Sequence, residues 1–379
     1  MSRGKQRVWL LGLGPEVRRV VVCGFVLALA GCTQPLLRAA PLESVRVGPN
    51  SRGFVLHPSG QPFTPWGFNY DHDDEGRLIE DYWFQEWGRV EEDLAEMKAL
   101  EANVVRVHLQ FGRFMRRPEQ PDEVALAQLS RLLALAERLS LYLDLTGLGC
   151  YHKQDVPAWY DALDEAGRWA AQAQFWRAVA ARGCHSPAVF CYDLMNEPVV
   201  AGAPRARGDW LGPPFGDKHF VQCVTLDAAG RERWQVARQW IERMVEAIRS
   251  RDRDHLITVG LVDWSLDRPG LTSGFVPERI IDRLDFISVH IYPERRQVDR
   301  ALDVLAGFAV GKPVVIEETF LLKCDGAEFT DFLERSRTHG AGWLSFYWGT
   351  SAAEYRRRGD LAAAIKAESL ERFCRARPR

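Results

Sequence analysis

Residues Val189 to Pro198 read Val-Phe-Cys-Tyr-Asp-Leu-Met-Asn-Glu-Pro, a mostly apolar run of strand length that ends in a polar pair. Short runs of this kind are typical of buried strands. The run Val189 to Met195 is one of eight, and the others are Trp66 to Tyr70, Asn103 to Leu109, Leu141 to Thr146, Leu256 to Val262, Asp285 to Tyr292, Pro313 to Glu318 and Gly342 to Trp348.

The segments around these runs have helical periodicity, at Val90 to Leu100, Val124 to Leu139, Ala170 to Arg182, Trp234 to Ser250, Val298 to Phe308, Phe329 to His339 and Leu361 to Phe373. Strand and helix that alternate in this way predict an α/β fold, a single (β/α)8 TIM barrel. A doubly wound open sheet is the alternative. That fold normally carries a glycine-rich phosphate turn after its first strand, and Asn69-Tyr70-Asp71-His72 is not such a turn.

The N-terminal region predicts export. Residues 1–31 carry basic residues and then the apolar run Val20 to Ala30, too short for a stable membrane span. Leu29-Ala30-Gly31-Cys32 resembles the bacterial lipobox, which implies a lipid anchor on Cys32. The alternative is an ordinary cleaved signal with an incidental cysteine. We therefore expect an exported protein, either a membrane-anchored lipoprotein or a secreted or periplasmic one.

Residues 32–44 form a short leader, and residues 45–379 are the expected catalytic barrel. A small N-terminal β-hairpin is predicted at its start, from Val45 to Pro65, around the turn Pro58-Ser59-Gly60.

The composition excludes several classes of protein. The chain has 379 residues, 46% hydrophobic and 26% charged, which is the balance of a globular protein rather than of a disordered or multi-span membrane chain. The formal net charge is -2 and no basic stripe is present, so nucleic acid is not an expected partner. Six of eight cysteines follow Cys32, and none forms a Cys-x-x-Cys pair, so a zinc site is not predicted. Disulfides and buried free thiols both remain open.

Polar residues follow the predicted strands, where barrel enzymes place their chemistry. Glu197 and Glu318 end the fourth and seventh strands and could converge on one bond. Hydrolysis of a glycosidic bond needs such a pair, one carboxyl group protonated and the other ionised. Arg106 and Tyr292 could hold Glu318 ionised and oriented. Other residues at strand ends could bind a sugar, Asn196 by a hydrogen bond and Trp348 by its flat ring.

Several of these motifs carry a resemblance to a known family. Tyr192 to Pro198 resembles the Asn-Glu-Pro signature of clan A glycoside hydrolases, and the chain from about Val45 resembles glycoside hydrolase family 5, the cellulase and mannanase family. The matching segments on other strands are Lys312 to Glu318, His290-Ile291-Tyr292, Arg106 and Trp348. The resemblance implies that Glu197 is the acid/base and Glu318 the nucleophile of a retaining enzyme without a metal or organic cofactor. It implies substrate-binding roles for Arg106, Asn196, His290, Tyr292 and Trp348.

One element departs from the family pattern. The family usually has a histidine after its third strand, whereas in this chain His152 comes several residues later. Asp144 and Thr146 share one face of the strand and could substitute for that histidine. This departure leaves the substrate subgroup open. It affects the predicted reaction less, because the two carboxylates are still in place. His108 and Glu317 also lie at strand ends, where His108 could be a core histidine and Glu317 an outward-facing neighbour of the nucleophile.

Loops at the expected mouth offer further candidates. Asp71-His72-Asp73-Asp74-Glu75 could bind a cation or sugar hydroxyls, although a solvated charge run is the commoner meaning. Trp159, Trp210 and Trp264 could stack on a sugar or simply pack.

The predicted function is hydrolysis of a β-linked oligo- or polysaccharide, a glucan, a mannan or a related glycoside, by double displacement. Two alternatives stay open, a catalytically silent glycan-binding lipoprotein and a transglycosylase.

Overall fold

The computed structural model describes residues 42–270 and 272–378. The predicted signal segment (1–31), the lipid-anchor site Cys32 and most of the leader (32–44) lie outside the described residues, so the anchor stays a prediction. Among the described residues, no helix combines the length and the apolar character that a membrane span requires.

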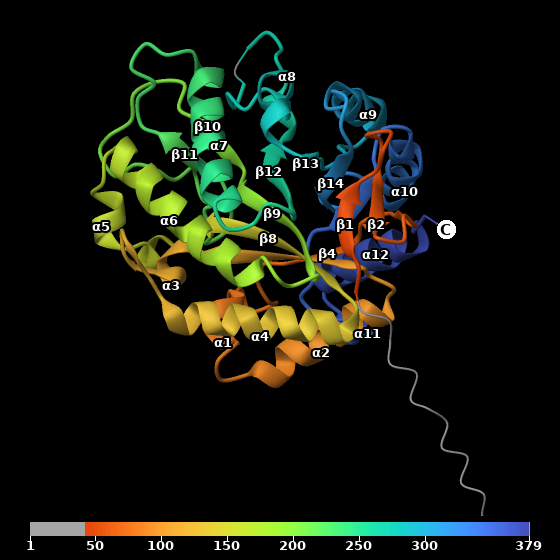
Figure 1. Cartoon of the computed structure of the whole chain (residues 1–379). Coiled ribbons are helices and arrows are strands. Elements are labelled where there is room, and N and C mark those ends of the chain that lie inside the picture. Colours follow the sequence, from red (N-terminus) through yellow and green to blue (C-terminus); the bar gives the residue numbers. More distant parts are fainter. Residues whose placement is uncertain (1–41, 271, 379) are drawn as a thin grey trace, which may run out of the picture. The chain divides into compact units, whose positions relative to one another are not determined.

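Eight parallel strands close into a barrel in the order β12-β13-β14-β15-β4-β5-β8-β9, which confirms the predicted (β/α)8 fold (Figure 1). These strands are β4 (Trp66–Tyr70), β5 (Val104–Gln110), β8 (Tyr142–Gly149), β9 (Val189–Asn196), β12 (Leu256–Val262), β13 (Ile287–His290), β14 (Val314–Thr319) and β15 (Gly342–Ser345). All eight predicted strands are present, and the last one ends three residues earlier than the sequence suggested.

Helices surround the barrel. The longer ones are α2 (Trp87–Ala99), α4 (Glu123–Leu139), α6 (Glu165–Gly183), α7 (Arg233–Arg249), α9 (Val298–Gly307), α10 (Gly326–Arg335) and α12 (Leu361–Arg375). Shorter helices are α1 (Ile79–Tyr82), α3 (Phe111–Phe114), α5 (Ala158–Asp161), α8 (Pro277–Ile280) and α11 (Ala352–Arg358), with 3-10 turns at Lys153–Asp155, Asp263–Ser265, Ile281–Arg283 and Ser336–Thr338. Outside the barrel, β6 (Met115–Arg117) pairs with β7 (Gln120–Pro121), and β10 (Pro198–Val200) with β11 (Gln222–Thr225).

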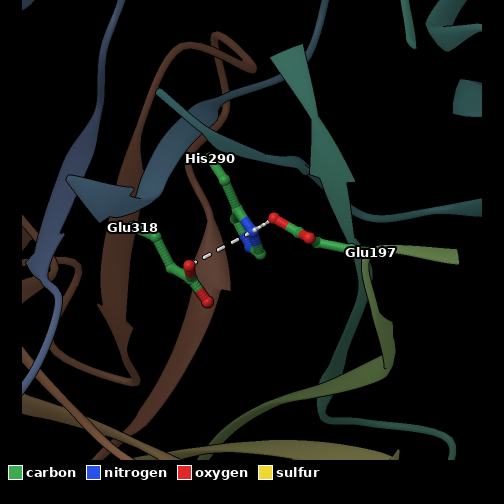
Figure 2. Close-up of side chains that lie close together, drawn as sticks. All are labelled: Glu197, His290 and Glu318. Carbon is green, nitrogen blue, oxygen red and sulfur yellow. Dashed lines mark hydrogen bonds and ion pairs between the residues drawn. The ribbon is translucent and has the colours of Figure 1, made fainter. Parts of the chain in front are cut away.

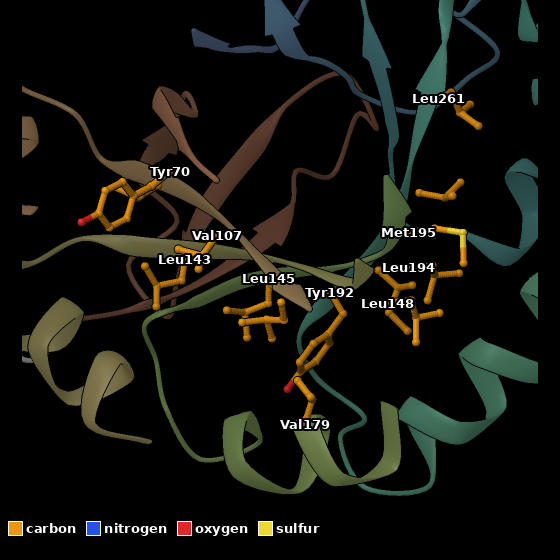
Figure 3. Close-up of a cluster of buried hydrophobic side chains, with 14 of the residues drawn as sticks. Tyr70, Val107, Leu143, Leu145, Leu148, Val179, Tyr192, Leu194, Met195 and Leu261 are labelled. Carbon is orange, nitrogen blue, oxygen red and sulfur yellow. The ribbon is translucent and has the colours of Figure 1, made fainter. Parts of the chain in front are cut away.

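The main core lies between the strands and the helices. Figure 3 shows part of it, where Tyr192 of β9 lies near Val179 of α6, and Leu143 and Leu145 of β8 belong to the same cluster. The helices fit this layer because their apolar residues recur on one face. Helix α4, for example, buries Leu126, Leu129 and Leu133, and Asp122 caps its N-terminus by accepting the backbone N–H groups of Val124 and Ala125.

A small sheet closes one end of the barrel. It consists of β1 (Ser44–Val47), β2 (Phe54–His57) and β3 (Pro62–Phe63) in antiparallel order, so the predicted hairpin is present with a third strand. Val45, Phe54 and Phe63 of this sheet pack against a second core cluster formed by residues near the strand starts, namely Val104, Tyr142, Phe190, Leu256, Phe286 and Val315. The plugged end is therefore the N-terminal end of the strands, and the opposite end is the mouth.

Six cysteines lie in the described part of the chain, Cys150, Cys184, Cys191, Cys223, Cys324 and Cys374, and all six are free thiols. The sequence left disulfides and free thiols open, and the structure shows free thiols at these six positions.

Candidate active site

Glu197 and Glu318 meet at the mouth of the barrel. Glu197 directly follows β9 and Glu318 lies near the end of β14, and the strands β12 and β13 separate the two in the barrel. His290, at the end of β13, lies between them, and Figure 2 shows its imidazole between the two carboxyl groups. One oxygen of each glutamate and a ring nitrogen of His290 all lie within 4.8 Å of one another. The two carboxyl groups can therefore act on one bond.

Glu197 has an unusual backbone conformation. Its φ is 47°, in the left-handed region, and its backbone N–H donates to the carbonyl of Gly260 at 2.9 Å. The pairing of β9 with β12 is irregular at this point, between Thr258 and Gly260. Such a conformation in a non-glycine residue costs on the order of 1 to 3 kcal/mol and is concentrated at functional sites. The strain lies at the residue that was predicted to be the acid/base.

Three side chains hold Glu318. Arg106 donates to its Oε1 at 2.5 Å, Tyr292 donates its hydroxyl to Oε2 at 2.6 Å, and Nδ1 of His290 lies 3.5 Å from Oε2. Arg106 and Tyr292 were expected to orient Glu318, and both contact it. Burial raises the pKa of Glu318; His290, Arg106 and Tyr292 act against this rise, whereas the charge of Glu197 adds to it. Three side chains thus contact the carboxyl group of Glu318, and about 6% of the Glu318 side chain remains exposed.

Arg106 lies fully buried at the centre of the polar network, on β5. Besides Glu318 it donates to Asn69, Asn196 and Asp193, at 2.9, 3.0 and 2.7 Å. Its guanidinium therefore joins residues from three other strands, β4, β9 and β14, and fixes the carboxamide of Asn196. The side-chain nitrogen of Asn196 also donates to the carbonyl of Phe220 at 3.1 Å, which leaves one amide hydrogen for a substrate.

His290 is engaged by the protein on both ring nitrogens. Nδ1 lies 2.9 Å from Oε1 of Glu197, and Nε2 lies 3.4 Å from Oε2 of Glu317. Burial alone would lower the pKa of His290, but Glu318, Glu197 and Glu317 outweigh it and raise this pKa to about 10. These contacts place His290 among the carboxylates, and its role in binding substrate stays a prediction.

A layer of buried polar side chains lies directly beneath this pair, and sequence reasoning did not identify it. Glu317 was considered as an outward-facing neighbour of the nucleophile, but it is fully buried inside the barrel and accepts the hydroxyl of Ser288 at 2.8 Å. Asp144 and Asp193 are also fully buried, and one oxygen from each of the three carboxyl groups lies within 4.8 Å of the other two. A charged residue inside an apolar strand run, such as Asp193, is the signal that could have revealed this layer.

The histidine at position 108 is a core residue. Its two ring nitrogens contact the hydroxyl of Tyr151 and Oδ1 of Asn69, and its side chain is buried. Thr146, considered above as a substitute for the family's third-strand histidine, donates to Asp193 at 2.8 Å. Both residues support the interior network.

The expectation that Trp348 offers its ring to a sugar is wrong for this structure. Trp348 is 1% exposed, packs against Phe68 and donates its indole N–H to Asp93 at 3.2 Å, outside the barrel mouth. The cause is the early end of β15 at Ser345, after which the chain no longer alternates as a strand. Phe346 takes the position near the site, with its ring centroid 6.3 Å from that of Tyr292.

The carboxylates of the acidic loop after β4 form ion pairs and hydrogen bonds with other side chains of the protein. Asp73 accepts the side chain of Arg77 at 2.8 Å, and Asp74 accepts Lys366 at 3.0 Å and the hydroxyl of Tyr355 at 2.8 Å. These carboxylates brace the loop, and the close acidic groups among the described residues lie elsewhere, at Glu197–His290–Glu318 and in the buried layer. Arg106 contacts both of those groups, so its guanidinium already neutralises part of their charge and disfavours a bound cation there.

Of the three tryptophans considered for stacking, two pack within the protein. Trp210 is 1% exposed beneath the guanidinium of Arg168, and Trp159 packs on Phe111. Trp264 is 40% exposed and lines a cavity of about 420 Å³ between the loop after β12, the segment after β13 and helix α9. Tyr292 forms part of the same wall, so the cavity adjoins the carboxyl pair.

Comparison with known proteins gives a family match over most of the chain. The family model described as cellulase, glycosyl hydrolase family 5, matches residues 56–352. The mannan endo-1,4-beta-mannosidase A of Podospora anserina is 31% identical over 167 residues, which cover 39% of this chain and 36% of that protein. The chain thus spans about a third of the length of this curated relative.

Solved structures share the fold. An exo-beta-1,4-mannosidase, Op5Man5, from Opitutaceae bacterium strain TAV5 is 19% identical, with a TM-score of 0.60 over 87% of this chain and 61% of that one. An endo-1,4-beta-mannanase from Eisenia fetida is 15% identical, with a TM-score of 0.60 over 89% of this chain and 96% of that one. At these identities the likeness concerns the fold.

Proposed function

The chain belongs to glycosyl hydrolase family 5, and on that premise we propose that it is a retaining hydrolase of β-linked glycans that acts by double displacement. The observation that carries the proposal is the approach of Glu197 and Glu318 to within 4.8 Å. Retaining glycosidases hold their two carboxyl groups about 5 to 5.5 Å apart, whereas inverting enzymes need about 6.5 to 9.5 Å to admit a water molecule.

In the proposed reaction, an oxygen of Glu318 attacks the anomeric carbon and the bond from that carbon to the leaving oxygen breaks. Glu197 gives its proton to the leaving oxygen in the same step. Glu197 then takes a proton from water, the water oxygen attacks the anomeric carbon, and Glu318 leaves as a carboxylate. Arg106 and Tyr292 stabilise that carboxylate by donating to it.

We propose a β-1,4-linked mannoside as the first substrate to test, because the relatives named above act on such bonds. Mannan and glucan oligosaccharides and aryl β-glycosides should be incubated with the protein, and the early product examined by proton NMR. We expect the released sugar to appear first as the β-anomer. An α-anomer would contradict double displacement, and tight binding without any product would favour a silent glycan-binding protein. A longer product in the presence of a second sugar would indicate transglycosylation.

The role of Glu197 can be tested in the same assay. A Glu197→Ala variant should lose hydrolysis of unactivated oligosaccharides, because it cannot protonate the leaving oxygen; proton transfer of this kind contributes about 10²- to 10⁴-fold. Added azide should restore turnover of an activated aryl glycoside and give a β-glycosyl azide, because azide needs no general base. An α-glycosyl azide would contradict the assignment of Glu197.

The cavity beside Tyr292 is the proposed place for the leaving-group side of the substrate. It opens at the ends of β12 and β13, the two strands between Glu197 and Glu318. Gly260 of β12 holds the backbone of Glu197, and the loop that carries Trp264 follows β12 directly. The exposed ring of Trp264 could stack on a sugar bound there.

Trp264→Ala should lower kcat/KM for a β-1,4-linked oligosaccharide by about 10-fold, the equivalent of about 1.4 kcal/mol of lost contact. Hydrolysis of an aryl glycoside, whose leaving group does not need a sugar subsite, should change by less than about 2-fold on the same scale. Leu361→Ala, which removes an exposed apolar side chain from α12, is the control. Equal losses with both substrates would show that Trp264 does not face the leaving group.

A further inference from the structure

The buried layer beneath the catalytic pair contains three carboxyl groups with unequal partners. Asp193 accepts three hydrogen bonds, from the backbone N–H of Gly260 at 2.7 Å, from Arg106 at 2.7 Å and from Thr146 at 2.8 Å. Burial and the charge of Glu317 raise the pKa of Asp193 to about 6, but Arg106 and Thr146 act against this rise, so the carboxyl group remains ionised at pH 7.

Glu317 also has donors on both oxygens. Ser288 donates to Oε1 at 2.8 Å, while Arg106 and Nε2 of His290 each lie 3.4 Å from Oε2. The surroundings of Glu317 therefore favour its ionised form, in agreement with a pKa lowered to about 2: burial acts to raise it, and Arg106 and His290 outweigh that effect.

Asp144 differs from both neighbours. It is fully buried on β8, and neither of its oxygens accepts a hydrogen bond from any described residue. The carboxyl groups of Asp193 and Glu317 lie within 4.8 Å of it, the guanidinium of Arg106 acts on its charge, and the thiol of Cys191 faces it from the paired position on β9. An ionised Asp144 would be a further anion without a hydrogen bond, in a buried layer whose one guanidinium, Arg106, already contacts Asp193, Glu317 and Glu318, and this is costly. A proton on Asp144 removes that charge and provides a donor.

His290 presents the opposite situation. Nδ1 faces Glu197 and Glu318, at 2.9 and 3.5 Å, and Nε2 faces Glu317 at 3.4 Å. A neutral imidazole would direct a lone pair at one of these carboxyl groups, whereas an imidazolium donates on both sides.

We propose that Asp144 is a neutral carboxylic acid that donates its proton to Glu317, and that Glu317 in turn holds His290 as an imidazolium between Glu197 and Glu318. Asp144 and Glu317 are then positioning residues, since neither is exposed to a substrate. Two cations, Arg106 and His290, face the carboxylates of Asp193, Glu317 and Glu318. Ser288, Thr146 and Thr258 are the neutral groups that complete the layer.

The inference deepens the proposed function, because the imidazolium would stabilise the negative charge that Glu197 acquires when it gives up its proton. It can nevertheless be tested without any activity. NMR of ring-labelled histidine reports the protonation of both nitrogens of His290 directly, so failure of the glycosidase assay and failure of this inference are separate results.

In the wild-type protein we expect both ring nitrogens of His290 to carry protons at pH 7 and the ring to lose one only well above pH 8, in line with its pKa of about 10. Glu317→Gln, which removes the charge facing Nε2, should lower this pKa by about 1 to 3 units. Asp144→Asn keeps a neutral donor and should shift it by less than about 0.5 unit. A neutral His290 at pH 7 in the wild type, or equal shifts in the two variants, would overturn the proposal.

A second measurement covers the case in which Glu317→Gln does not fold. The infrared difference spectrum between the wild type and Asp144→Asn at pH 7 should contain the carbonyl band of a protonated carboxylic acid, since other protonated groups such as Glu197 contribute equally to both spectra. The absence of this difference band would equally overturn the proposal. Where activity is found, Glu317→Gln should lower kcat and leave KM nearly unchanged, because Glu317 does not reach the substrate. A change confined to KM would contradict a positioning role.

Discussion

Glu318→Gln is expected to lower kcat/KM for a β-glycoside by about 10⁴-fold or more, the scale of losses seen when an enzyme loses its nucleophile. The amide is nearly isosteric with the carboxylate: its one oxygen can still accept from Arg106, and its NH2 group can donate to the hydroxyl of Tyr292, but it cannot form the bond to the anomeric carbon. Unfolding of the variant should remain cooperative, and its denaturation midpoint should stay close to that of the wild type.

The same experiment can separate Glu318 from its neighbour Glu317. A 2-deoxy-2-fluoro glycoside with a good leaving group should leave a sugar covalently attached to the wild-type protein, and peptide mass spectrometry should place it on Glu318. Glu317 is completely buried, so a sugar on that residue would contradict the assignment. Glu334→Gln, at an exposed position of α10, serves as the matched control and should retain wild-type activity.

Arg106→Met is expected to destabilise the fold by about 3 to 5 kcal/mol, because it leaves buried carboxylates without their cation. Arg106 lies 2.7 Å from Asp193 and 2.5 Å from Glu318, with all three side chains buried. Urea unfolding at pH 7 should show the loss. Since protonation removes the orphaned charges, the difference from the wild type should shrink as the pH falls.

Two further variants serve as comparisons for the stability of Arg106→Met. Arg106→Lys keeps the charge but not the forked geometry and should lose less stability than Arg106→Met. Arg117→Met, at an exposed arginine, should change the free energy of unfolding by less than about 0.5 kcal/mol. An Arg106→Met protein as stable as the Arg117→Met protein would show that the buried carboxyl groups do not depend on this guanidinium.

The fold could be predicted because apolar runs and helical periodicity alternate along the chain. The positions of Glu197 and Glu318 followed from the same pattern, since parallel strands end at one face of the barrel. The contacts of Arg106 and Tyr292 with Glu318 also agree with expectation.

The remaining details depend on features that a sequence pattern does not carry. Strands of a parallel barrel are buried on both faces, so the sequence did not reveal that Glu317 points inward. The error at Trp348 has another cause: its apolar run continues past Ser345, where hydrogen bonding of the strand ends. The contacts of His290 arise from three carboxyl groups on other strands, which no local motif can show.

The small sheet formed by β1, β2 and β3 seals the barrel at the end opposite Glu197 and Glu318. The described chain enters the fold at this sealed end, at Leu42. Coupling the protein to a bead or sensor chip through its N-terminal side would therefore leave the entrance for glycans unobstructed. Attachment at an engineered cysteine near Trp264 would instead obstruct that entrance.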